Sequence, residues 1–393
     1  MNAIAVSRSL ARGRRDLLFV TLLLGQSSQS LAFTAFVAGL PQMALNWGVR
    51  GPFLAQMTMA VAALGMMGGS IVSGWVLERA GTRYTLVGSL IAYAITGAEA
   101  LVWPDPTAVL VARFANGLAA AFMATACLWG ISAEYTGPAR ARVLGISAAL
   151  SNLIAFAGTL VGGGLAKLAG WQLAFIQFPV FGLLGCPLAL MSVQQVYPSE
   201  AREKDSATPF LRRLLPFFLL ATFLFAVRFM PSTQLPFVLN DNGIRDSGAR
   251  ALVIAAITVA ATLSSFAYGP IQQRLSATGT FAAGSACMAT GLAIVAESRH
   301  FGSTLLGALS MGVASGVLGP YVYHVVSERS ESASRSRALG ILGAFCFLGG
   351  FLNPLCGTPV QAVVGLRGLF LLVAAAMSVT ALIAAGRRGH RGT

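Results

Sequence analysis

The feature that most constrains this chain is a succession of twelve apolar segments, each bounded by charged residues, proline or glycine. The segments are 17–44, 53–77, 85–103, 107–133, 143–168, 172–195, 214–239, 249–270, 280–297, 302–326, 338–363 and 367–386. A helix that spans a lipid bilayer needs about 20 mostly apolar residues. Only 10% of the 393 residues are charged, whereas an ordinary soluble domain has about a quarter. The pattern predicts an all-α integral membrane protein with 12 transmembrane helices and excludes a soluble enzyme.

The positive charges fall unequally on the two sides of the predicted membrane. The formal net charge is +14, but the charged residues are dispersed singly among apolar segments, which excludes the basic patch of a nucleic-acid-binding protein. If both ends lie on one side, the connections there hold nineteen Arg and Lys against six on the other side. Cytoplasmic loops carry such an excess, so both termini are expected in the cytoplasm. The five cysteines lie in apolar stretches without ligand spacing and predict no disulfide or metal site.

The two halves of the sequence match at one fixed shift of 195 residues. The clearest matches are Leu40-Pro41 with Leu235-Pro236, and 140–146 (RARVLGI) with 335–341 (RSRALGI). A single shift that serves distant matches without gaps indicates a duplicated six-helix unit, so we expect two parallel pseudo-twofold six-helix halves. The predicted parts are an N-terminal half over 1–196, a cytoplasmic linker over 197–213 and a C-terminal half over 214–393.

The connection after the second apolar segment carries a recognisable motif. Residues 74–83 read GWVLERAGTR, which resembles the G-x-x-x-D-R-x-G-R-R signature of the major facilitator superfamily (MFS), with glutamate in place of aspartate. Residues 113–117 (RFANG) are similar to that family's R-x-x-x-G element. The resemblance extends over essentially the whole chain. It implies the MFS fold, in which a central cavity opens alternately to either side, and a place among the bacterial drug/proton antiporter-like efflux permeases.

The resemblance also implies a setting and a set of partners. It implies a monomer in the bacterial inner membrane, surrounded by lipid, that exchanges a small-molecule substrate for protons and needs no cofactor. The antiporter group carries Gly-Pro-x-x-Gly-Gly in span 5, whereas residues 158–163 (GTLVGG) keep the glycines and lack the proline. This departure weakens the prediction of antiport.

In this family the loop after span 2 is understood as a latch, which pairs helix ends across the cytoplasmic seam in one state and releases them in another. Glycine permits close helix approach and tight turns, and charges suit the ends of helices of opposite dipole. The residues expected to take part in gating are Gly74, Glu78, Arg79, Gly81, Arg83, Glu134, Arg140 and Arg274. The alternative for Glu134 and Arg140 is solvated loop charge, worth under about 1 kcal/mol per pair.

Two arginines lie deep inside apolar segments, where a charge costs about 2.5 to 3.5 kcal/mol even on the insertion scale. We expect a substrate or counter-ion role for Arg228, with a structural tie to backbone carbonyls as the alternative. For Arg113, helix packing, proton coupling and substrate binding all stay open. The predicted substrate-binding residues are Gln26, Gln29, Phe33, Arg113, Asn116, Arg228, Gln234 and Asn353. Each neutral polar member is equally suited to joining helices, at about 0.6 kcal/mol per contact.

The sequence shows no nucleophile paired with a base, no metal cluster and no phosphate-cradling loop, so neither an enzyme nor an ATPase is expected. A gradient must then supply the energy, and one charge crossing 100 mV is worth about 2.3 kcal/mol. The leading hypothesis is a secondary active transporter that expels a small organic solute by proton-coupled alternating access. The alternative is uptake or exchange of an organic anion bound by the intramembrane arginines. A third class is a membrane sensor that transports nothing.

Overall fold

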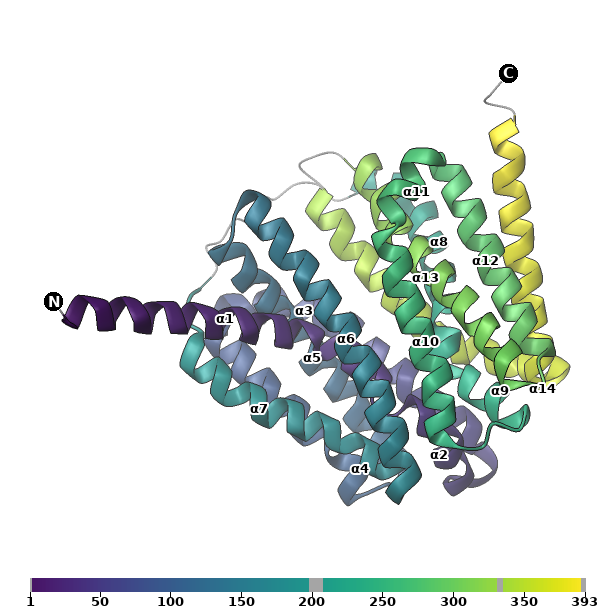
Figure 1. Cartoon of the computed structure of the whole chain (residues 1–393), viewed down its shortest axis with the longest axis horizontal. Helices are drawn as coiled ribbons and strands as arrows, with labels where there is room; N and C mark the ends of the chain where they lie inside the picture. Colours follow the sequence, from purple (N-terminus) through teal and green to yellow (C-terminus); the bar gives the residue numbers. More distant parts are fainter. Residues whose placement is uncertain (1, 198–207, 331–334, 390–393) are drawn as a thin grey trace. The chain divides into compact units, whose positions relative to one another are not determined.

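The computed structural model describes residues 2–197, 208–330 and 335–389, and every regular element in these ranges is a helix (Figure 1). The α-helices are α1 (Asn2–Thr34), α2 (Leu40–Asn46), α3 (Gly51–Gly97), α4 (Glu99–Val102), α5 (Pro106–Glu134), α6 (Gly137–Ala169), α7 (Gln177–Ser192), α8 (Thr208–Thr233), α9 (Leu235–Asp241), α10 (Ser247–Phe266), α11 (Tyr268–Arg274), α12 (Ala277–Glu297), α13 (Phe301–Arg329) and α14 (Arg335–Gly389). The 3₁₀ helices are η1 (Val37–Gly39), η2 (Gly48–Arg50) and η3 (Trp171–Ile176).

Ten stretches of the described chain are long and apolar enough to cross a membrane. Two of them, Gly48–Val102 with 55 residues and Ala338–Gly386 with 49, are far longer than a bilayer requires. Each contains one glycine outside the helical region, Gly81 (φ 73°) and Gly365 (φ 74°). Glycine adopts such a backbone without strain, so each long stretch divides there into two spans. The predicted all-helical membrane fold is confirmed, and the division of two stretches fits the predicted twelve spans.

Apolar side chains cover the outside of the helices as well as their packed faces. Leu183, Leu263 and Leu382 are 68%, 65% and 72% exposed. A helix that is hydrophobic all round belongs either in a large core or in a membrane. Because these side chains lie on the surface of the chain, their natural surroundings are the hydrocarbon of the bilayer.

The first of two compact units consists of Met1–Ala35, Val61–Gly158 and Gln172–Lys204. Within it, α1 packs against α5 and α7. The centre of this unit is the middle of α5, where Met123, Ala126 and Cys127 are fully buried.

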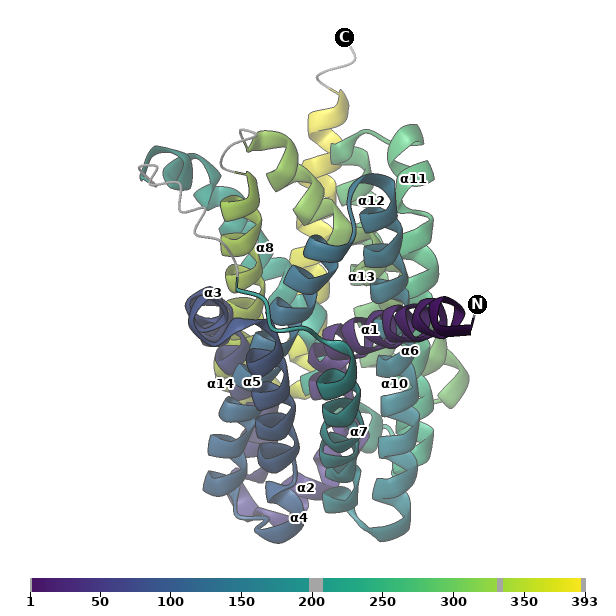
Figure 2. The ribbon, with the colours of Figure 1, turned by 90° about the vertical axis from the view of Figure 1, so that its left-hand side faces the viewer.

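The second compact unit consists of Phe36–Ala60, Thr159–Trp171 and Asp205–Thr393. In this unit α12 packs against α13 and α14, and α10 packs against α13; Figures 1 and 2 show α10, α12 and α13 running alongside one another. The first-half elements η1 and α2 pack against α9 and α10.

The compact units do not follow the predicted halves, because residues 36–60 and 159–171 of the first half pack with the second half. Most of the predicted linker over 197–213 lies outside the described residues. The division into halves describes the duplication of the sequence and stays a prediction.

Glycines allow α3 and α5 to touch through their backbones. A Cβ on Gly117 would lie 2.2 Å from the Ala62 carbonyl oxygen, and a Cβ on Gly65 would lie 2.2 Å from the Phe114 carbonyl oxygen. Neither position accepts a side chain unless the helices separate. A Cβ on Gly74 would meet nothing within 4 Å, and the part of Gly74 in gating stays a prediction.

We expect Gly117→Ala to lower the free energy of unfolding by about 1 to 3 kcal/mol, because the added methyl group forces α3 and α5 apart. Gly74→Ala is the matched control: its methyl group meets open space, and alanine favours a helix by up to about 1 kcal/mol over glycine. Thermal unfolding of the purified protein in detergent measures both. A Gly117→Ala variant as stable as the parent would contradict the packing described above.

Candidate functional site

Two long helices are interrupted at matching places. α1 ends at Thr34 and is followed by η1 and α2, while α8 ends at Thr233 and is followed by α9. α2 and α9 are each seven residues long, and each carries a proline in its first turn, Pro41 and Pro236. Proline has no N–H, and inside a membrane every freed carbonyl needs another donor. Interrupted helices at corresponding positions also mark the binding sites of transporters with repeated halves.

Side chains from other helices supply the donors at the first interruption. Three carbonyls, spaced three residues apart, accept these bonds: Ala32 from Arg113 Nη2, Ala35 from Gln177 Nε2 at 2.8 Å, and Ala38 from Arg250 Nε at 2.9 Å. The last turn of α1 and the η1 turn are therefore held by side chains and not by the helix ladder alone.

Arg113 lies on the buried face of α5 and is 1% exposed. Besides the Ala32 carbonyl, its Nη1 donates to Asn116 Oδ1 at 2.8 Å, and its guanidinium carbon lies 5.2 Å from the centre of the Phe178 ring. Asn116 donates in turn to the Tyr93 carbonyl at 3.2 Å. The structure thus brings Arg113 and Asn116 together, and these contacts are those of the helix-packing alternative.

Arg228 on α8 has a different environment from Arg113. Its side chain is exposed, although Ala221 and Leu224 on the same face of the helix are buried. Its guanidinium carbon lies 5.2 Å from the centre of the Phe225 ring, and a Cβ on Gly319 would lie 2.9 Å from its Nη1. Among the residues that the structure describes, no hydrogen bond or ion pair occupies this guanidinium.

The second interruption brings together two predicted residues. Asn353 accepts a bond from Thr233 Oγ1 at 2.6 Å and donates to the Ala226 carbonyl at 2.8 Å, so it joins α14 to α8. Gln234, between α8 and α9, is 1% exposed, and neither atom of its side-chain amide has a partner within the described part of the chain. A buried amide without partners is rare in proteins and marks Gln234 as a candidate for contact with a ligand or water.

The remaining predicted substrate residues lie on α1. Gln26, Gln29 and Phe33 are half-buried, and the carbonyl oxygen of the Gln26 side chain has no partner within the described ranges. Their role in substrate binding stays a prediction.

The loop at Gly81 is held by the residues that follow α7. Gln195 Oε1 accepts from the backbone N–H groups of Arg83 at 3.1 Å and Tyr84 at 3.3 Å, and Gln195 Nε2 donates to the Ala80 carbonyl at 2.5 Å. Arg83 Nη2 also donates to the Leu190 carbonyl at 2.8 Å. Gln195 was missed because a single glutamine after a helix carries no periodic signal.

The other predicted gating residues are exposed. The guanidinium of Arg79 lies 3.9 Å from the centre of the Trp75 ring, and Glu78 has no ion-pair partner among the described residues. The part of Glu78 and Arg79 in the latch stays a prediction. Glu134, Arg140 and Arg274 are exposed near helix ends, and their part in gating stays a prediction.

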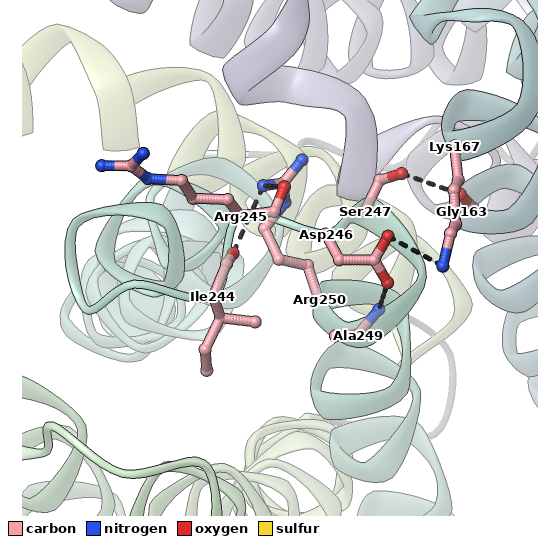
Figure 3. A network of polar contacts seen from close by, with 8 residues as sticks. All are labelled: Gly163, Lys167, Ile244, Arg245, Asp246, Ser247, Ala249 and Arg250. Atoms are coloured by element: carbon pink, nitrogen blue, oxygen red, sulfur yellow. Dashed lines mark hydrogen bonds and ion pairs between the residues drawn. The ribbon is translucent and has the colours of Figure 1, made fainter.

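The sequence also did not predict a polar network that lies at the end of α6 and the start of α10 (Figure 3). Lys167 Nζ lies 3.2 Å from Asp246 Oδ1, and Ser247 Oγ donates to the Gly163 carbonyl at 3.0 Å. Arg250 is 1% exposed and donates from Nη1 to the Arg245 carbonyl at 2.7 Å. We call Gly163, Lys167, Asp246, Ser247 and Arg250 the α6–α10 network.

The α6–α10 network could have been suspected from one local signal. Asp246 precedes α10 as its N-cap and accepts from the Ala249 N–H at 2.9 Å, with Arg250 four residues later. The Ala249 N–H and the Lys167 ammonium hold the pKa of Asp246 below its usual range. The carboxylate is therefore ionised from about pH 5 upward. Its contribution weakens only as the pH falls through that lowered pKa.

Known proteins similar to this chain are membrane transporters. Residues 22–245 match the model of the Major Facilitator Superfamily. The 3-(3-hydroxy-phenyl)propionate transporter of Escherichia coli (strain K12) is 28% identical over 304 residues, which cover 72% of each chain. The Multidrug resistance protein B homolog of Mycobacterium tuberculosis (strain ATCC 25618 / H37Rv) is 29% identical over 206 residues, which are 52% of this chain but only 35% of that relative.

The fold has counterparts among solved structures. A POT family transporter in complex with 5-aminolevulinic acid has a TM-score of 0.77 and 13% identity, with 95% of both chains covered; this likeness concerns the fold alone. The family model, in contrast, matches more than half of the 393 residues. This protein therefore belongs to the major facilitator superfamily.

Proposed function

We propose that this protein is a secondary active transporter that moves a small organic solute across the bacterial inner membrane by alternating access. We further propose that it works as a monomer in proton-coupled efflux. Membership of the superfamily and similarity to a multidrug resistance protein support the proposal. The observation that carries it is the α6–α10 network, because its contacts join first-half and second-half segments at one end of the helices.

The α6–α10 network suits an outer gate. With both termini in the cytoplasm, as the positive-inside rule favours, the end of α6 and the start of α10 lie on the outer side. The side chains of Lys167 and Asp246 are 61% and 42% exposed, so their pairing contributes under about 1 kcal/mol and breaks readily. Ser247 and Arg250 bind backbone carbonyls, and water can take their place with little enthalpic loss.

Asp246 is a fixed partner in this gate and not a proton carrier. Because its pKa is lowered, it stays ionised on both sides of any physiological proton gradient. The proton that drives efflux must therefore bind to another group. It affects the gate only indirectly, through the movement of helices.

A second candidate function is the transport of an organic anion. The exposed guanidinium of Arg228, next to the Phe225 ring, favours it, since a guanidinium binds carboxylates in a bidentate manner. The Escherichia coli relative is named as a 3-(3-hydroxy-phenyl)propionate transporter. An aromatic acid would meet both the charge of Arg228 and the ring of Phe225.

We expect Arg228 variants to separate the two candidates in proteoliposomes. If an aromatic acid is the solute, Arg228→Ala lowers its transport at least about tenfold. Arg228→Lys retains part of the transport, because lysine keeps the positive charge but lacks the planar guanidinium that binds a carboxylate through two hydrogen bonds. If efflux of neutral compounds is the activity, both variants pump like the parent. Arg245→Ala, which removes an exposed guanidinium at a loop, is the control. Unchanged transport of aromatic acids by Arg228→Ala would refute the second candidate.

We expect Asp246→Asn to shift the protein toward an open outer gate by up to about fivefold, because it removes the ion pair with Lys167 and keeps an amide that can still cap α10. Spin labels at Leu45→Cys and Arg245→Cys report the distance between the first-half and second-half segments. Arg50→Gln is the matched control outside the network.

The same labels test the pH dependence. The difference in distance distribution between Asp246→Asn and the parent should be the same at about pH 5.5 and at about pH 7.5 if no substrate is present, because a lowered pKa keeps Asp246 ionised at both values. If neither Asp246→Asn nor the double variant Asp246→Asn with Arg250→Met changes the distances, the network is not the outer gate.

A further inference from the structure

A cavity of about 730 Å³ lies at the end of α9. Three parts of the chain line it: the end of α9 with the residues that follow, the connection between α12 and α13, and the turn at Gly365 in α14. Its volume falls within the range of about 300 to 1,000 Å³ that is usual for small-ligand sites. We call it the α9 cavity. None of its lining residues belongs to the predicted substrate or gating sets.

The α9 cavity lies where apolar helices end. α12 ends at Glu297 and α13 begins at Phe301, and both helices are long and apolar enough to cross a membrane. The ends of such helices lie at the depth of the lipid headgroups. Val238, Val364 and Leu366 give the cavity apolar walls, so it can receive a ligand with a charged head and an apolar body.

Arg367 presents a preoriented guanidinium to this cavity. Its Nε donates to the Ala296 carbonyl at 2.8 Å, and its Nη2 donates to Glu297 Oε2 at 2.5 Å. Within the described residues its Nη1 has no partner. A side chain that is already held by two contacts loses little further conformational freedom when it binds a ligand.

Two further charges of opposite sign line the α9 cavity without forming ion pairs. Arg299 and Asp241 are both exposed, and neither pairs with an opposite charge among the residues that the structure describes. Partial burial raises the pKa of Asp241, against a smaller opposing effect of the Asn240 side chain. A carboxylate that has lost part of its hydration gains from a cation placed beside it.

We propose that the α9 cavity binds a zwitterion, with the ammonium group at Asp241 and the phosphate or carboxylate group at Arg299 and Arg367. Guanidinium groups match the geometry of both anions, and the separated charges of the cavity match the two ends of a zwitterion. Two sources share this chemistry: the headgroup of phosphatidylethanolamine and a water-soluble zwitterion such as phosphoethanolamine. The proposal is independent of the direction and coupling of transport.

The test is ligand binding to the purified full-length protein in a neutral detergent, measured by thermal shift and by direct titration. Phosphatidylethanolamine should bind about tenfold tighter than phosphatidylglycerol, which has no ammonium group, and tighter than phosphatidylcholine, whose ammonium has no N–H. Asp241→Asn should remove the preference over phosphatidylglycerol. Arg299→Gln should weaken binding of all three lipids about tenfold. Arg245→Gln, an exposed arginine outside the cavity, is the matched control and should bind like the parent.

The two sources are separated by competition. If phosphoethanolamine displaces the lipid at comparable concentration, the cavity binds the soluble zwitterion; if only the lipid binds, the cavity is a headgroup site. Both results support a zwitterion site. Equal binding of the three lipids would overturn the proposal, and so would an unchanged preference in Asp241→Asn together with an unchanged affinity in Arg299→Gln. A folding defect in one variant leaves the other as the test, because the two residues lie on different elements.

Discussion

The rest of the structure depends on how backbone carbonyls find donors where a helix breaks inside a bilayer. Hydrocarbon offers none, and each unpaired group there costs several kcal/mol. At the first break, Arg113, Gln177 and Arg250 each donate to one carbonyl. At the second break, Thr233 donates to Asn353, which in turn donates to the Ala226 carbonyl about two turns earlier in α8. At the first break, the polar residues inside the spans are therefore matched to the place where the regular helix ends.

Arg250 shows how the same requirement links stability to motion. It is almost fully buried, and it donates to the Ala38 carbonyl of the first half as well as to the Arg245 carbonyl beside it. A buried cation is costly unless its hydrogen bonds are made. Arg250 makes them from Nε and Nη1, whereas its Nη2 has no partner among the described residues. Any movement that separates η1 from α10 must supply water to Arg250 and Ala38 together. Opening at this end is thus coupled to hydration, while the exposed pair of Lys167 and Asp246 adds a weaker and more readily broken contact.

The sequence was enough to predict features that repeat along the chain. It did not reveal features that depend on which residues lie next to one another in space. Length and hydropathy were enough for the helical membrane fold, and the matched Leu-Pro pairs at a shift of 195 mark the two helix breaks. The partner of Arg113 is the backbone carbonyl of Ala32, and a carbonyl carries no residue-type signal. The glycines show the same limit: Gly117 contacts the Ala62 backbone, whereas Gly74 faces open space, and nothing in the sequence near either one distinguishes them.

The two intramembrane arginines show why residue type alone does not assign a role. Arg113 is buried, with its guanidinium bonded to the Ala32 carbonyl and to Asn116. Arg228 is exposed beside Phe225, and the carbonyl of Ala226 near it is satisfied by Asn353. An arginine whose donors are used for the backbone cannot bind a solute unless those bonds break, which would again leave a carbonyl unpaired. An arginine whose neighbouring carbonyls already have donors keeps its own N–H groups for a ligand. This difference in the supply of donors, and not depth in the membrane, makes Arg228 the better candidate for binding an anion.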